Sequence, residues 1–380
     1  MSANRKKNLG LTRIHTVHKL NVLIFITVLA GMFACNQNEN KSTSQNPAEN
    51  LSQPELSLKQ PEGALLAGVS RAICYSGFRS GQHPDRGDGA VNPSREEILE
   101  DLKILSEKCN FKLIRVYDSG ENSEMVLSII KENNINIKVL LGIWLRAELS
   151  NHETCEWLTE PIPETELQKN KTLNLNEIKK GIKLANEYKD IVVAVNVGNE
   201  ALVEWNDHKV ATDTIISYVS KVKKSVGQPV TVADNYKWWA VHGAELAKVV
   251  DFVSVHIYPV WEGKDINEGL SWSIENLKEV KNAIPKARIV ITEAGWASVS
   301  SEFGARASEE KQAQYFNELL NWTNEMNITT FWFEAFDEDW KGNPNDMMGA
   351  EKHWGIFTVD RKPKKVMQQF FVEKHQPKGL

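Results

Sequence analysis

The chain has 380 residues, of which 41% are hydrophobic, so it can bury a large core. Its 45 basic and 50 acidic side chains give a net charge of −5 at pH 7, and residues 1–34 hold five of the positive charges and no negative one. Without that segment the net charge would be −10. An acidic chain without basic runs is a poor binder of nucleic acid or anionic lipid headgroups, so we expect a neutral substrate.

The N-terminus has the pattern of an export signal. Residues 1–19 are basic, and the apolar run Val22–Ala34 follows them. A run that is too short to span a bilayer and ends in a small residue is typical of a secretory signal peptide. Cys35 directly follows this run and resembles the lipidated cysteine of a bacterial lipobox, although Met32 stands where leucine is usual.

We therefore expect residues 1–34 to be removed as a lipoprotein signal peptide. Cys35 would then carry the lipid that anchors the protein in a bacterial cell envelope, at the outer membrane. One acyl chain binds a membrane only marginally, so stable anchoring needs the additional chains that lipobox processing supplies. An uncleaved N-terminal anchor is the alternative, and the sequence leaves open which side of the membrane displays the protein.

The segment 35–62 is polar, rich in Asn, Ser and Gln, and almost free of large apolar side chains. Such a segment cannot bury enough surface to offset the entropy of ordering it, so it predicts a flexible linker. The remaining residues, 63–380, are predicted to form a single domain of the size of an α/β barrel.

Three cysteines follow Cys35, namely Cys74, Cys109 and Cys155. They allow one disulfide at most, and their spacing matches no zinc motif. We expect buried or free thiols and no metal.

The domain shows a regular alternation of strand and helix patterns. Near-continuous hydrophobic runs suit parallel strands that are buried on both faces. The eight predicted strands are Ala64–Val69, Lys112–Val116, Ile135–Leu141, Ile191–Val197, Pro229–Val232, Phe252–Ile257, Arg288–Ile291 and Ile328–Phe333.

Amphipathic helices are predicted between these strands. The five predicted helices are Ser94–Cys109, Asn176–Tyr188, Thr212–Val226, Trp272–Ala283 and Glu309–Met326. Eight such units favour a (β/α)8 TIM barrel over an open doubly wound sheet, because no glycine-rich phosphate-binding turn follows the first predicted strand. Residues 145–173 show little helical pattern, so we expect a long loop there that shapes the rim of the barrel or forms a disordered insertion.

Two glutamates stand at the carboxyl ends of predicted strands, where side chains of a barrel point into the active site. Glu200 follows the fourth strand and Glu293 follows the seventh. Hydrolysis of a glycosidic bond needs such a pair, because one carboxyl group must protonate the leaving oxygen while the other attacks the anomeric carbon or activates water. An Asn-Glu pair alone would be weak evidence for a catalytic residue. The prediction rests on the position of both glutamates at the carboxyl ends of predicted strands.

The twelve tryptophans all lie between Trp144 and Trp354, and several stand at or just beyond strand ends. For any one of them, packing in the core is the better interpretation. Together they favour flat apolar platforms of the kind that bind the C–H faces of sugar rings.

These motifs resemble glycoside hydrolase family 17, a family of retaining (β/α)8 glycosidases. The resemblance covers nearly all of residues 64–365. It rests on the segments Ile114–Asp118, Val197–Glu200, Ile257–Pro259, Thr292–Trp296, Phe331–Lys341 and Glu351–Phe357.

The resemblance implies endo-acting cleavage of β-1,3-glucan such as laminarin, with Glu200 as acid/base and Glu293 as nucleophile. It implies no cofactor, and we expect a monomer. It also implies substrate-binding roles for Tyr117, Asn199 (on the sugar 2-OH), Tyr258 (steering Glu293), Trp296, Trp332, Glu334, Lys341 and Trp354. Ala297 stands where plant members usually have proline, and the eighth-strand region differs from the plant form.

Two alternatives remain open. A β-1,3-glucanosyltransferase would use the same intermediate but pass it to a sugar. A non-catalytic glucan-binding surface lipoprotein would need neither Glu200 nor Glu293, so the presence of both argues against it.

Overall fold

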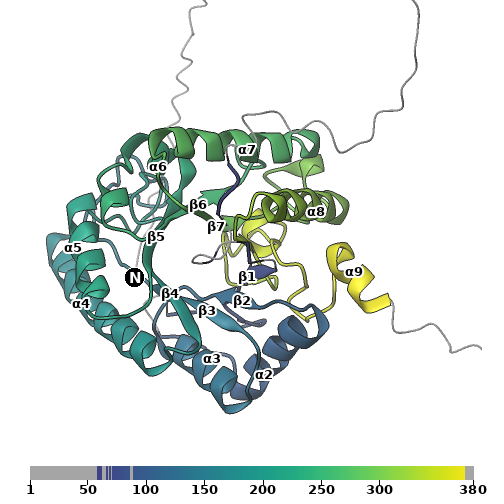
Figure 1. Cartoon of the computed structure of the whole chain (residues 1–380), viewed down its shortest axis with the longest axis horizontal. Coiled ribbons are helices and arrows are strands. Elements are labelled where there is room, and N and C mark those ends of the chain that lie inside the picture. The colour runs from purple at the N-terminus through teal and green to yellow at the C-terminus, as the bar shows by residue number, and fades with distance from the viewer. Residues whose placement is uncertain (1–57, 62–65, 67, 70, 86–88, 373–380) are drawn as a thin grey trace, which may run out of the picture. The chain divides into compact units, whose positions relative to one another are not determined.

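The computed structural model of the chain describes residues 58–61, 66, 68–69, 71–85 and 89–372. The expected signal peptide and Cys35 lie outside these residues. Eight parallel strands pair in sequence order and close into a barrel, since β1 pairs with both β2 and β8. Figure 1 shows the strands as a ring with the helices outside it. The predicted (β/α)8 barrel is confirmed.

The strands are β1 Ala72–Cys74, β2 Leu113–Arg115, β3 Lys138–Ile143, β4 Val192–Asn199, β5 Val230–Asn235, β6 Val253–Ile257, β7 Ile289–Ala294 and β8 Thr330–Trp332. The helices are α2 Arg95–Lys103, α3 Glu121–Glu132, α4 Glu164–Glu187, α5 Thr212–Lys223, α6 Tyr236–His242, α7 Ile266–Ala283, α8 Glu309–Glu325 and α9 Lys365–Val372. None of the helices within the described residues is long and apolar enough to cross a membrane.

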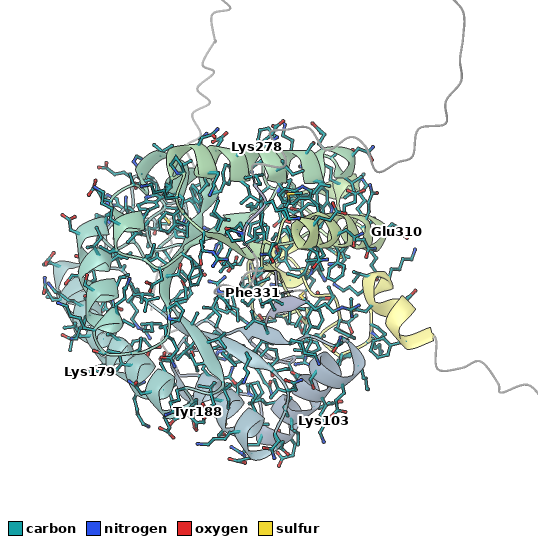
Figure 2. The ribbon with its side chains drawn as sticks, viewed as in Figure 1. Lys103, Lys179, Tyr188, Lys278, Glu310 and Phe331 are labelled. Atoms are coloured by element: carbon teal, nitrogen blue, oxygen red, sulfur yellow. The ribbon has the colours of Figure 1, made fainter. Side chains whose placement is uncertain are left out.

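Side chains alternate along each strand between the barrel interior and the helix layer. Phe331 of β8 is fully buried and lies near the centre of the ring in Figure 2, whereas Lys278 and Glu310 lie on the outer helices. The next residue along β8, Trp332, packs against Phe316 of α8. Because of this alternation, only every second residue of a strand points into the barrel interior, from which it can reach the mouth of the barrel.

The helix predicted at Ser94–Cys109 begins where expected. The Ser94 hydroxyl accepts a hydrogen bond from the backbone N–H of Glu97, and the Glu97 carboxylate accepts one from the backbone N–H of Ser94. This reciprocal capping box satisfies two N–H groups that have no partner within the helix. The α-helix ends at Lys103 and continues as a short π-helical segment, Ile104–Lys108.

The prediction of the first strand was wrong. In the expected range 64–69, Leu66 has a φ of 47° and Gly68 a φ of 65°, which a β-strand cannot contain. The strand that closes the barrel is the fully buried segment Ala72–Cys74. An apolar run of suitable composition was therefore mistaken for a strand that begins three residues after it.

The predicted long loop and linker are also shorter than expected. Helix α4 begins at Glu164, inside the segment 145–173 that showed little helical pattern. Within the expected linker, Leu58 and Gln60 are buried, and the Gln60 side chain pairs with the backbone N–H and carbonyl of Ile289 at 2.7 and 2.8 Å. The end of the linker thus packs against the first residue of β7. Helices α3, α6 and α9 were not predicted.

Candidate active site

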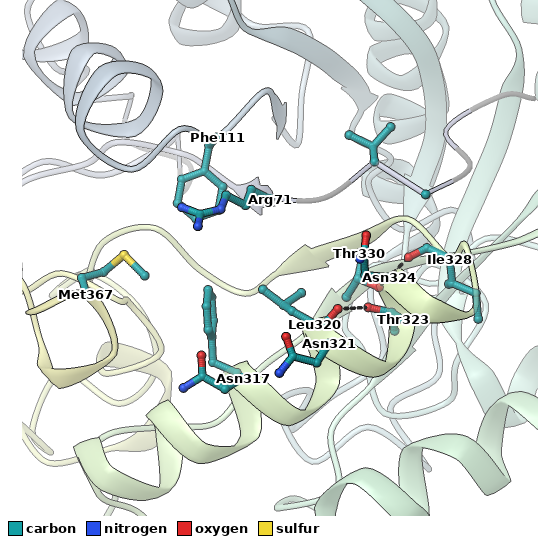
Figure 3. A pocket seen from close by; sticks show the side chains of 13 residues that line it. Arg71, Phe111, Asn317, Leu320, Asn321, Thr323, Asn324, Ile328, Thr330 and Met367 are labelled. Atoms are coloured by element: carbon teal, nitrogen blue, oxygen red, sulfur yellow. Dashed lines mark hydrogen bonds between the residues drawn. The ribbon is translucent and has the colours of Figure 1, made fainter. Parts of the chain in front are cut away.

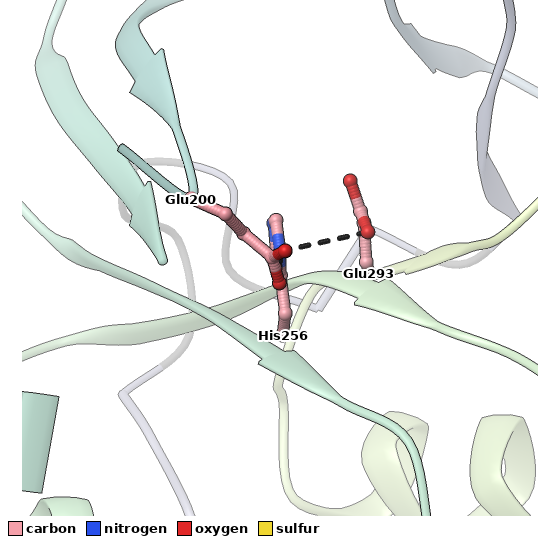
Figure 4. Close-up of side chains that lie close together, drawn as sticks. All are labelled: Glu200, His256 and Glu293. Carbon is pink, nitrogen blue, oxygen red and sulfur yellow. Dashed lines mark hydrogen bonds and ion pairs between the residues drawn. The ribbon is translucent and has the colours of Figure 1, made fainter. Parts of the chain in front are cut away.

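Glu200 and Glu293 meet at the carboxyl end of the barrel. Glu293 belongs to β7 and Glu200 directly follows β4. The register between β4 and β5 shifts between Asn196 and Asn199, and Glu200 has a φ of 47°. Left-handed backbone at a non-glycine residue is uncommon and clusters at functional sites. One carboxylate oxygen from each glutamate and one ring nitrogen of His256 all lie within 4.8 Å of one another, as Figure 4 shows.

Glu293 is held by a cation and two phenols. Arg115 Nη1 donates to Glu293 Oε1 at 2.7 Å, and Tyr117 donates to the same oxygen at 3.0 Å. Tyr258 donates to Oε2 at 2.7 Å. Burial and the charge of Glu293 raise the pKa of Tyr258 well above its usual value, so this hydroxyl remains a donor. These three donors fix the orientation of the Glu293 carboxylate.

His256 lies between the two glutamates and is fully buried. Its Nδ1 is 2.9 Å from Glu200 Oε1 and 3.5 Å from Glu293 Oε2. Its Nε2 lies 3.1 Å from Arg115 Nη1. A guanidinium can only donate, so Nε2 faces a donor, whereas Nδ1 faces the Glu200 carboxylate, to which it can donate.

Glu200 has a hydrogen-bond partner on each carboxylate oxygen. Oε1 faces His256, and Oε2 accepts from Asn206 Nδ2 at 3.1 Å. Burial raises the pKa of Glu200, but the hydrogen bond and electrostatic attraction of His256, together with the hydrogen bond from Asn206, outweigh burial and lower the pKa below its usual value. A carboxyl group that serves as a general acid must carry a proton, which these partners disfavour. A bound sugar that displaces water strengthens the effect of burial and so favours the protonated acid.

Asn199 lies beside Arg115, at the end of β4. Its side-chain oxygen accepts from Arg115 Nη2 at 2.5 Å, and its backbone carbonyl contacts His208 Nε2 at 2.8 Å. The guanidinium therefore fixes which way the amide points and leaves the Nδ2 hydrogens for another acceptor. This orientation suits the expected contact with a sugar hydroxyl.

A second charged cluster follows β8. Lys341 Nζ contacts Glu334 Oε2 at 2.5 Å and Glu338 Oε2 at 2.8 Å. Glu338 also accepts from the hydroxyl of Ser76 at 2.7 Å. Glu334 is buried beneath Lys341, whose side chain is 12% exposed, so Lys341 is the better placed of the two to meet a substrate.

The tryptophan predictions need correction. Trp296 and Trp332 are both 0% exposed. Each packs against Tyr315 in the helix layer, so neither ring face is open to a sugar. Trp354 is 1% exposed, and its ring centroid lies 5.2 Å from that of Tyr258. It therefore packs against a residue of the site and does not form an open platform. The sequence could not separate these residues from open ones, because their burial depends on segments distant in the sequence that pack over each ring.

The sequence did not assign roles to four residues that complete the site, namely Arg115, Asn206, His256 and Glu338. A signal was present for two of them. Arg115 precedes Tyr117, and His256 precedes Tyr258, by two residues, which places each pair on the same side of an extended segment. Asn206 and Glu338 lie in loops, where no two-residue periodicity indicates the direction of a side chain.

The group of Glu200, His256 and Glu293 has the residue types of a metal site. The buried guanidinium of Arg115 already lies 2.7 Å from Glu293 and 3.1 Å from His256. A second cation in this space would be repelled by Arg115, so the donor set fits a metal poorly.

Within the described residues, Cys74, Cys109 and Cys155 are free and buried. Burial raises the pKa of both Cys74 and Cys109 to about 12, so these thiols remain protonated and unreactive near neutral pH.

A separate cavity of about 460 Å³ lies beside α8. Figure 3 shows Arg71 and Phe111 on one side of it and Asn317 and Leu320 of α8 on the other. Neither catalytic candidate lines this cavity, so it is distinct from the site at the strand ends.

Residues 72–355 match the family model of the BtgE/BtgC glycoside hydrolase domain. The chain is 28% identical over 298 residues to the probable glucan endo-1,3-beta-glucosidase btgC of Aspergillus flavus, which covers 72% of this chain and 40% of that protein. The chain thus spans less than half the length of this relative. It is 26% identical over 325 residues to a glucan 1,3-beta-glucosidase of Arthroderma benhamiae, covering 79% and 94% of the two chains.

Solved structures share the fold. An endo-laminarinase from Formosa Hel1_33_131 superposes with a TM-score of 0.69 at 28% identity, covering 82% of this chain and 88% of that one. A glycoside hydrolase family 17 β-1,3-glucanosyltransferase from Rhizomucor miehei has a TM-score of 0.60 at 22% identity, covering 79% and 97%. The family match runs from the first barrel strand to beyond the last, and the chain therefore belongs to the BtgE/BtgC glycoside hydrolase domain family.

Proposed function

We propose that the protein is a retaining, endo-acting β-1,3-glucan hydrolase. The observation that carries the mechanism is the approach of Glu200 and Glu293, whose nearest carboxylate oxygens lie within 4.8 Å. Retaining glycosidases hold their carboxyl groups about 5–5.5 Å apart, whereas inverting enzymes need about 6.5–9.5 Å to admit a water molecule. The names of the related proteins support β-1,3-glucan as the substrate.

In the first step Glu293 attacks the anomeric carbon and Glu200 gives its proton to the leaving oxygen. The bond between C1 and that oxygen breaks, and a glycosyl ester forms on Glu293. In the second step Glu200 takes a proton from water, which attacks C1 and releases Glu293 with net retention of configuration.

The surrounding residues have distinct tasks in this proposal. Arg115, Tyr117 and Tyr258 hold the Glu293 carboxylate aimed at C1. Asn199, oriented by Arg115, binds the 2-OH of the reacting sugar. Lys341 is proposed to contact the substrate, with Glu334 holding its ammonium group.

Digestion of laminarin tests the function. We expect early products of intermediate length by mass spectrometry, and β-anomers as the first products by NMR. The acidic charge of the chain predicts no cleavage of alginate, an anionic polymer. Products longer than the substrate would indicate the glucanosyltransferase, and binding without products would indicate the non-catalytic alternative. Strong cleavage of alginate with none of laminarin would refute the substrate.

We also propose that the protein is exported and anchored to the envelope through a lipid on Cys35, and that it is a monomer. The basic and apolar segments before Cys35 support the anchor. Substitution Cys35→Ser should release the protein from membranes or leave it unprocessed, whereas normal processing with unchanged membrane partition would contradict the anchor. Light scattering of the folded protein without residues 1–34 tests the monomer.

A further inference from the structure

The loop between β4 and α5 carries an exposed tryptophan next to the acid/base. Trp205 is 48% exposed. The next residue, Asn206, donates to both the carbonyl oxygen and Oε2 of Glu200, at 3.0 and 3.1 Å. The exposed ring therefore stands one residue from a side chain that touches the catalytic carboxyl group.

The backbone of this loop is fixed by buried donors from the loop after β3. Asn151 Nδ2 donates to the carbonyl oxygens of Glu204 and Asn206 at 2.6 and 2.9 Å. The Cys155 thiol donates to the carbonyl oxygen of Trp205 at 3.1 Å. Asn151 and Cys155 are themselves buried. These hydrogen bonds fix the backbone around Trp205, while the ring itself is exposed to solvent. A preorganised binding surface combines these two properties.

The hydrogen-bond partners of the two Glu200 oxygens indicate on which side of the scissile bond this loop lies. Oε1 faces His256, which also approaches Glu293, whereas Oε2 faces Asn206. The loop with Trp205 therefore lies on the side of Glu200 away from the nucleophile. Because Glu200 protonates the leaving oxygen, this is the side of the departing sugar chain.

We propose that Trp205 is the stacking platform for the first sugars on the leaving-group side, where a neutral β-linked glucan binds. This inference rests on the proposed glucanase function. An indole presents a flat apolar face with a polar edge, which suits the C–H face of a glucose ring.

The same platform would hold an acceptor sugar after the first product leaves. The acceptor hydroxyl then attacks C1, the ester bond to Glu293 breaks, and Glu200 takes the hydroxyl proton. Trp205 would therefore set how often the intermediate passes to sugar rather than to water.

The test compares two substrates in variants of the full barrel. Laminarin fills both sides of the site, whereas β-laminaribiosyl fluoride has a leaving group too small to reach Trp205. We expect Trp205→Ala to lower the ratio of kcat/KM on laminarin to kcat/KM on the fluoride by about 10- to 100-fold, the effect of exposing one large apolar side chain. The fraction of transfer products at high oligosaccharide concentration should fall as well.

Two further variants make the result specific. Trp205→Phe keeps a flat ring and should restore most of the ratio. Trp272→Ala removes a tryptophan of α7 whose Nε1 donates to Glu262 at 3.0 Å, and should leave the ratio unchanged. An unchanged ratio in Trp205→Ala, or equal losses on both substrates in a folded variant, would overturn the proposal. A wild-type protein that cleaves the fluoride but not laminarin would instead contradict the proposed glucanase function.

Discussion

The surroundings of the two catalytic glutamates differ in charge and in the elements that supply them. Glu293 lies within a strand and receives hydrogen bonds from Arg115, Tyr117 and Tyr258. Glu200 follows its strand in a left-handed conformation and receives hydrogen bonds from His256 and Asn206. Glu293 thus pairs with a guanidinium and two phenols, whereas Glu200 pairs with an imidazole and with an amide from a loop. The difference suits the proposed roles, since a nucleophile must be aimed at one atom whereas an acid must gain and lose a proton.

Removal of the nucleophile is expected to have the largest effect. Glu293→Ala eliminates the covalent route and should lower turnover by about a million-fold. Azide should enter the vacated space and give the inverted α-glycosyl azide, which NMR can identify. Formation of the β-azide by this variant would reverse the two roles.

Loss of the acid should cost less. General acid catalysis contributes typically about 10²–10⁴-fold, and Glu200→Ala should lose least with a good leaving group that needs little protonation. Azide should intercept the ester on Glu293 and give the β-glycosyl azide. Equal losses on laminarin and on an activated substrate would contradict the acid role.

Tyr258→Phe tests how firmly the nucleophile is held. It removes one of the donors to Glu293, and a hydrogen bond to a charged group corresponds to about 10- to 100-fold in kcat/KM. Tyr315→Phe is the control, because Tyr315 is a buried tyrosine whose hydroxyl pairs with Ser273, 2.7 Å away, in the helix layer and not with Glu293. Equal losses in the two variants would show a general packing effect instead.

The smallest expected effect is a change in pH dependence. The hydrogen bond from His256 lowers the pKa of Glu200, so its removal in His256→Ala should raise that pKa. A general acid with a higher pKa keeps its proton to higher pH, and the alkaline limb of kcat/KM should move upward. Asn206→Ala should shift it in the same direction. The pH profiles of both variants measure this, and a downward shift in either would contradict the assignment.

The sequence alone predicted the barrel and the position of Glu200 and Glu293 at the ends of its strands. Both depend on local patterns, namely buried β-branched runs at regular spacing and polar residues where those runs end. In a parallel barrel the carboxyl ends of all strands lie on one face, so a residue at the end of a strand is predicted to lie on that face. The error at Ala64–Val69 shows the limit of composition, since Leu66 and Gly68 adopt positive φ angles that an apolar run does not reveal.

Only the tertiary structure determined which of these side chains are exposed to a substrate and which residues they pair with. Trp296 and Trp332 look like sugar platforms in the sequence, yet they face the helix layer, while the loop residue Trp205 is open. Arg115 and Glu293 are 178 residues apart and form one ion pair, and the buried Arg361 pairs with Asp101, 260 residues away. Exposure and pairing of this kind arise only when distant segments pack together, because neither the direction of a side chain nor its partner is encoded by its neighbours along the chain.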